Sequence, residues 1–213
     1  MGNELYSRRY HQSTQRSLID MDKIELLYDH YKETFSIIQE NLNQRNRFFV
    51  MAFFIMTLQF LFAVSPESIA TLITTIIRNE YDIDISGQII TIQSLLWLVL
   101  LYFTMRYYQS TVHIERQYNY IHTLEATIAS SIQISFDREG GNYLKDYPKM
   151  NDMIDILYKW IFPIIYCVVI FCKIISEYID TQLNLSIIFD SIIFLCCFVL
   201  TILYLIFLHG KKE

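Results

Sequence analysis

The chain has little of several things that soluble domains usually contain. Only five glycines and three prolines occur among its 213 residues, so long stretches contain no helix breaker. Charged residues make up 18%, below the roughly 25% of soluble domains, and four windows contain almost none. A soluble core would spread its apolar residues at helical or strand spacing instead. This uneven deficit of charge indicates a membrane protein.

An excess of basic charge and paired cysteines are also missing. The net charge is −5, which argues against direct binding of nucleic acid. The cysteines have neither C-x-x-C nor Cys/His metal spacing, and all of them lie in two apolar windows. They are Cys167, Cys172, Cys196 and Cys197. We interpret them as small side chains buried in the membrane rather than as redox or metal sites.

No pattern in the sequence predicts catalysis. It contains no Gly-rich phosphate loop, no nucleophile elbow and no His-Glu-x-x-His motif. His122 and Glu125, three residues apart on one predicted helix, have a spacing that would suit a metal. We interpret them instead as a solvent-facing pair. We therefore expect no enzymatic activity, no metal and no cofactor.

Four apolar windows are present in place of these features. A spanning helix needs about 20 residues, and the first two windows reach the lower limit of about 17. The windows are Phe48–Val64, Ile89–Met105, Leu157–Ile175 and Leu185–Leu208. We expect Pro163 to kink the third. The predicted fold class is an all-α membrane protein with four transmembrane helices and long cytoplasmic helical extensions that form a stalk.

The distribution of Lys and Arg predicts the topology. Fifteen of the seventeen lie in the N-terminal segment, the central loop or the tail, and only Arg78 and Lys173 lie in the other connections. The positive-inside rule predicts a multi-pass inner-membrane protein in which the side with fifteen Lys and Arg, together with both termini, faces the cytoplasm. Five regions follow. They are a cytoplasmic segment (1–46), a transmembrane pair with an outer loop (47–105), a cytoplasmic helix and connector (106–156), a second pair (157–208) and a tail (209–213).

Two amphipathic stripes lie in the predicted cytoplasmic segments. The first repeats at alternating spacings of four and three, which is typical of a coiled-coil seam. Its members are Ile24, Tyr28, Tyr31, Phe35, Ile38 and Leu42. The second stripe runs from Ile114 to Ile132 on a helix that should continue to near Ile134 and stop at Asp137–Gly141. We expect the two stripes to pack together, within one chain or between copies.

The predicted outer loop contains a shorter amphipathic stretch. Apolar residues from Ile69 to Ile77 recur at helical spacing, Pro66 precedes them, and threonines occupy the other face. We interpret this stretch as a helix lying on the outer leaflet. A re-entrant segment at the mouth of an oligomer is the alternative.

Four polar side chains lie inside the apolar windows. Gln59 and Gln93 are expected to form hydrogen bonds between spans or between subunits. Lys173 and Asp190 are at similar predicted depths on neighbouring spans, and an isolated charge at mid-bilayer costs about 2.5–3.5 kcal/mol. An ion pair would lower that cost, and separate extension of both side chains to the outer surface would lower it too. A minor alternative has Asp190 facing an aqueous pore.

The span pattern, together with the connector Asp137-Arg138-Glu139-Gly140-Gly141-Asn142-Tyr143-Leu144 into Tyr147-Pro148, resembles membrane components of bacterial anti-phage defence systems. Examples are the transmembrane proteins that accompany retron reverse transcriptases and the membrane subunit of Kiwa. The resemblance implies a homo-oligomeric effector that compromises the inner membrane when triggered, with a soluble defence protein or ribonucleoprotein as its partner. A membrane anchor or sensor that recruits a soluble partner through its cytoplasmic helices is the alternative. The Tyr143–Pro148 stretch is either a plain connector or a docking surface.

Overall fold

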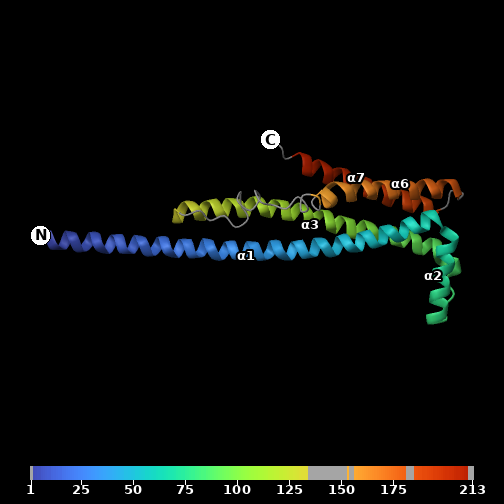
Figure 1. The fold of residues 1–213 in the computed structure, drawn as a ribbon, viewed down its shortest axis with the longest axis horizontal. Coiled ribbons are helices and arrows are strands. Elements are labelled where there is room, and N and C mark those ends of the chain that lie inside the picture. The colour runs from blue at the N-terminus through green and yellow to red at the C-terminus, as the bar shows by residue number, and fades with distance from the viewer. Residues whose placement is uncertain (1, 134–152, 154–155, 181–184, 211–213) are drawn as a thin grey trace. The chain divides into compact units, whose positions relative to one another are not determined.

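The described part of the chain is helical, which confirms the predicted all-α class. The computed structural model describes residues 2–133, 153, 156–180 and 185–210. Figure 1 shows that the described residues form helices, with no strand among them. The elements are α1 (Gly2–Val64), α2 (Pro66–Tyr81), the 3₁₀ turn η1 (Ser86–Gln88), α3 (Ile89–Ile132), the π-helical turn η2 (Leu157–Ile161), α6 (Phe162–Asp180) and α7 (Leu185–His209).

Proline sets the boundary between α1 and α2. No Gly or Pro lies between residues 3 and 65, so nothing in the sequence interrupts α1 before that point. The residue before a proline is disfavoured in the α conformation, and Ser65 has φ −142° and ψ 68°. Pro66 then occupies the first turn of α2, where a missing N–H is tolerated. The new helix therefore begins directly after the break.

Four helical segments are long and apolar enough to cross a membrane. They are Met21–Val64, Ser86–Ile132, Leu157–Ser176 and Ser186–Leu208. Each contains one of the predicted apolar windows, the last of them starting one residue later than predicted. The chain therefore has the helices of a multi-pass membrane protein, whereas its orientation across the membrane stays a prediction. The helix α6 continues to Asp180, which is beyond the end of the predicted window at Ile175.

The residues divide into two compact units. Unit 1 consists of Met1–Leu42 and His113–Pro148, and unit 2 of Asn43–Val112 and Lys149–Glu213. Long helices α1 and α3 contribute residues to both units, and the remaining elements belong to unit 2. The cytoplasmic stalk stays a prediction, as do the membrane boundaries of the five regions.

Unit 1 has a small core between its two helical segments. The buried side chains are Tyr31, Ile38, Ile121, Leu124 and Ile128, with Leu27, Phe35, Leu42, Tyr118 and Ile132 packed against them. Four of the six seam residues therefore contact the second stripe. Tyr28 differs, because it is 41% exposed and stacks on Tyr31 with a centroid distance of 6.5 Å. A supercoiled geometry and a contact between copies stay predictions.

Unit 2 buries an aromatic-rich core and exposes apolar side chains. Trp97, Leu100, Tyr107, Phe162 and Tyr166 are among the core residues, each at most 2% exposed. Large apolar side chains also face outward on each spanning helix. They include Phe54, Leu95, Val168 and Leu203, which are 54–67% exposed. Such an exterior suits contact with lipid rather than with water.

The predicted cytoplasmic helix after the second span and the predicted outer amphipathic stretch are both helical, whereas the predicted connector lies outside the described residues. α3 ends at Ile132, close to the expected Ile134, and Gln133 has a positive φ of 55°. The outer amphipathic stretch forms α2, which has no buried residue and is not among the helices long enough to span. Its place at the outer leaflet stays a prediction. The connector from Asp137 to Pro148 lies outside the described residues.

Candidate intramembrane polar site

Gln59 connects the first two spanning helices. Its side chain is fully buried, and its Nε2 donates a hydrogen bond to the main-chain carbonyl of Gln93 at 3.1 Å. The two residues are therefore brought together as expected, although the side chain of Gln93 is not the acceptor. Interhelical hydrogen bonds of this kind contribute about 0.6 kcal/mol on average in membranes. The contact fixes the register of α1 against α3.

The next residue of α3 makes a second contact, with a different helix. Ser94 Oγ donates to Asp190 Oδ2 of α7 at 3.0 Å, and the two side chains are 7% and 4% exposed. Serine and threonine hydroxyls in helices commonly bond to a carbonyl of their own preceding turn, as Thr57 does to Phe53. Ser94 instead stabilises a carboxylate on another helix. Sequence reasoning singled out Asp190 but missed this partner.

Lys173 of α6 is buried as well. Its side chain is only 4% exposed, the same value as for Asp190. This burial argues against separate extension of both side chains to the outer surface, whereas the expected Lys173–Asp190 ion pair stays a prediction. Together with Gln59 and Ser94, these residues give each of the four spanning helices a buried polar group. Polar groups at such positions face the helix bundle because lipid offers them no partner.

Pro163 leaves a main-chain carbonyl that a tyrosine satisfies. In the π-helical turn η2, the N–H of Phe162 donates to the carbonyl of Leu157, five residues back. The same register would pair the carbonyl of Tyr158 with position 163, where proline has no N–H. The hydroxyl of Tyr107 takes that place and donates to the Tyr158 carbonyl at 2.6 Å. Pro163 thus lies beside a π turn with an interhelical bond, and the expected kink stays a prediction.

Two arginines pack on aromatic rings near this turn. The Arg45 guanidinium lies 4.6 Å from the ring centroid of Tyr158, and that of Arg106 lies 5.3 Å from Phe48. The Phe49 ring also contacts Tyr158, at 4.7 Å between centroids. Cation–π contacts hold charges beside apolar surface where lone cations would be costly. Arginines and aromatics together are typical of a membrane–water interface, whereas the assignment of this end to the inner side of the membrane stays a prediction.

Unit 1 has its own buried carboxylate. Glu125 is 2% exposed, and its Oε1 accepts a hydrogen bond from the hydroxyl of Tyr31 at 3.0 Å. The expectation that His122 and Glu125 form a solvent-facing pair was therefore wrong for Glu125. The i, i+3 spacing predicts a shared face but does not tell which neighbouring helix covers that face. No group of three His, Cys, Asp or Glu residues that would suit a metal occurs in the described ranges.

Searches among family models, curated proteins and solved structures find no match to the chain.

Proposed function

We propose that the chain is a non-enzymatic protein of the bacterial inner membrane that acts as an oligomeric effector in anti-phage defence. Its lethal step is loss of the membrane barrier after triggering. The observation that carries this proposal is the buried Ser94–Asp190 contact between α3 and α7. An ionisable group inside spanning helices is costly, and such groups usually mark a functional path or switch. A passive anchor has no need of one.

The described arrangement is the closed form of the proposed effector. Gln59, Ser94, Lys173 and Asp190 are each at most 7% exposed, whereas the helices around them present apolar side chains outward. One copy therefore offers water no polar path through the described residues. Opening requires α7 to separate from α3, which breaks the Ser94–Asp190 bond. Several copies then arrange these polar groups around a common aqueous axis.

A matched pair of hydroxyl deletions tests the proposal. Ser94→Ala removes the donor to Asp190, whereas Thr57→Ala removes a hydroxyl that bonds only within its own helix. We expect cells that express Ser94→Ala to lose membrane potential and take up propidium iodide at lower expression than the unchanged chain requires. Thr57→Ala should match the unchanged chain. Normal potential at every expression level, with protein verified in the membrane, would overturn the effector role.

Two further variants separate a pore-lining role of Asp190 from a pairing role. If the carboxylate lines the open path, Asp190→Asn should lower cation conductance in planar bilayers without impairing assembly. If it pairs with Lys173, Asp190→Asn should impair assembly. Exchanging the two residues should then restore assembly in part, because the pair survives in reverse.

A second candidate function is a membrane anchor or sensor that recruits a soluble defence protein or ribonucleoprotein. Unit 1 supports it with an exposed patch in which His30 Nε2 lies 2.8 Å from the hydroxyl of Tyr120. Tyr120 is 48% exposed, and exposed aromatic residues often carry binding energy in interfaces. In this case Tyr120→Ala should abolish co-purification of the soluble partner while membrane potential stays normal during a verified defence response.

A further inference from the structure

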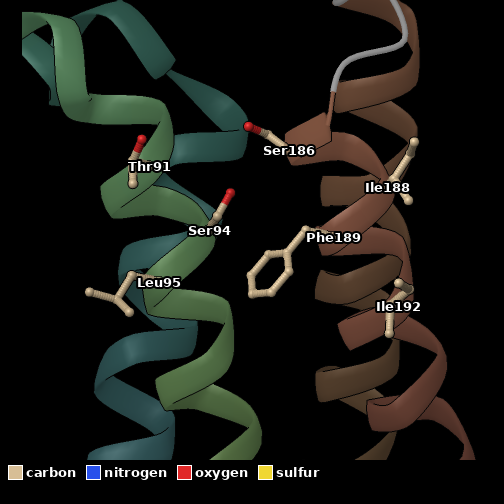
Figure 2. Close-up of a pocket in the computed structure, with 7 residues that line it drawn as sticks. All are labelled: Thr91, Ser94, Leu95, Ser186, Ile188, Phe189 and Ile192. Atoms are coloured by element: carbon tan, nitrogen blue, oxygen red, sulfur yellow. The ribbon is translucent and has the colours of Figure 1, made fainter.

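A groove opens between the first turns of α3 and α7 in unit 2. It has a volume of about 530 Å³, within the usual range for small-molecule sites. Its lining consists of Thr91, Ser94, Leu95, Ser186, Ile188, Phe189 and Ile192. Figure 2 shows the Phe189 ring reaching from α7 toward α3, with the Ser94 and Ser186 hydroxyls above it. Four of the lining side chains are apolar and 42–59% exposed, so the groove faces the surroundings of the helices.

The lining is polar at one end and apolar at the other. Thr91 and Ser186 lie in the first turns of their helices, whereas Leu95 and Ile192 lie about one or more turns further along. Figure 2 shows the same order, with the hydroxyls at one end and Leu95 and Ile192 toward the other. Within the described residues, neither the Thr91 nor the Ser186 hydroxyl has a hydrogen-bond partner. Within the described part of the chain, the groove therefore offers two hydroxyls without a partner above an apolar wall.

The chemistry of the lining selects among occupants. No charged side chain is among the described residues that line the groove, so an anionic headgroup would find no cation among them. Packing of a second spanning helix favours small residues; these lie only at the polar end of the groove, and the apolar wall consists of Leu, Ile and Phe. A flexible acyl chain fits such a wall without close backbone approach. Its head must exchange hydrogen bonds with hydroxyls and carry no negative charge.

We propose that this groove binds a neutral acyl amphiphile with a hydroxyl-bearing head, of the monoacylglycerol class. The head exchanges hydrogen bonds with Thr91 and Ser186, and the chain lies along Phe189 and Ile192. The groove adjoins the Ser94–Asp190 bond through Ser94, which belongs to both. The binding site does not depend on the effector role, because it needs only helices that contact lipid.

Photolabelling tests the proposal on the full-length chain. The chain is reconstituted into phosphatidylcholine nanodiscs with a trace of monoacylglycerol that carries a diazirine on its acyl chain. Peptide mapping should find saturable labelling at residues 91–95 and 186–192, and unlabelled monoacylglycerol should compete with it. A fatty acid of the same chain length should compete at least about tenfold less well, because the lining has no cation.

Two tryptophan substitutions on α7 give a matched comparison. Ile192 and Leu203 are 58% and 59% exposed, but only Ile192 lines the groove. Ile192→Trp should reduce groove labelling at least about fivefold by filling the space, and Leu203→Trp should leave it unchanged. Ser186→Ala, a milder change, should weaken competition by monoacylglycerol about threefold through the loss of one hydrogen bond.

Three outcomes would overturn the proposal. One is labelling spread evenly over the exposed apolar residues of all spans, which means bulk lipid only. The second is groove labelling that Ile192→Trp and Ser186→Ala both leave unchanged. The third is zero-length cross-linking of residue 192 between two copies, with monoacylglycerol unable to displace it, which makes a second copy the occupant.

Discussion

Each unit of the molecule buries one carboxylate against a hydroxyl from another helix, and the surroundings of the two carboxylates differ. Glu125 of unit 1 accepts from Tyr31, and Asp190 of unit 2 accepts from Ser94. Charged residues such as Asp29 and Lys32 cover the outside of unit 1, whereas apolar residues such as Phe54 and Leu203 cover unit 2. If unit 1 opens, water can solvate its carboxylate. If unit 2 opens in a membrane, only lipid or another polar group is available.

The same hydroxyl–carboxylate contact therefore has different consequences in water and in lipid. In water, a buried hydroxyl–carboxylate bond mainly fixes which partner a helix chooses, because the open state is also solvated. In lipid, separation leaves the carboxylate without solvent unless other copies or water enter. The unit 2 contact is therefore suited to a switch that opens only in an assembly. The unit 1 contact is suited to holding two helices together.

The largest expected effect is on topology, since the comparison depends on which unit meets water. Single cysteines at Ser130 and Ser86, placed in a chain that lacks its four native cysteines, report the two sides. An impermeant maleimide added to intact cells should label position 86 and not position 130, because the positive-inside rule puts unit 1 in the cytoplasm. Permeabilised cells should label both. External labelling at position 130 would reverse the assignment.

The next effect concerns the core of unit 1. Tyr31 is 1% exposed, so Tyr31→Ala should lower the free energy of local opening by about 3–5 kcal/mol. Hydrogen exchange of the amides in residues 113–132 measures this change. Tyr28 lies three residues before Tyr31 on the same helix but is 41% exposed. The control substitution Tyr28→Ala should therefore cost below about 1 kcal/mol. Equal loss of protection in both variants would contradict the described core.

A smaller effect is expected at the π turn of unit 2. Tyr107→Phe removes the donor to the Tyr158 carbonyl and should cost about 1–3 kcal/mol in detergent unfolding titrations. Pro163→Ala restores a main-chain N–H that the carbonyl can use. In that background, the cost of Tyr107→Phe should fall below about 0.5 kcal/mol. An unchanged cost would show that the tyrosine acts through packing alone.

The smallest effect concerns an exposed carboxylate, which serves as a reference for the two buried ones. The main-chain N–H of Ser86 donates to Asp84 at 3.0 Å and lowers the pKa of that carboxyl. A carboxyl with a lowered pKa stabilises the fold above its unfolded value of about 3.9, and this contribution is lost as the pH falls through the folded pKa. Exchange protection of the Ser86 amide should therefore drop only in acid, and Asp84→Asn should remove that pH dependence.

A feature could be predicted from the sequence when residues close together in the chain determine it, and not when it depends on contacts between helices. Four spans and the break at Pro66 were predictable, because run length and the restriction that proline puts on the preceding residue act within a few residues. The contact of Ser94 was not, because most span hydroxyls, such as that of Thr57, bond within their own helix. The role of Tyr107 depends on which carbonyl the π register frees, and that register is not visible in the sequence.

Tolerance to substitution should differ sharply between two residues that form one contact. Gln59 reaches the main-chain carbonyl of Gln93, and every amino acid supplies that carbonyl. Position 93 should therefore accept many residues in a saturation screen for membrane assembly, whereas position 59 should accept few. This one hydrogen bond thus restricts the choice of amino acid at position 59 and leaves the choice at position 93 open.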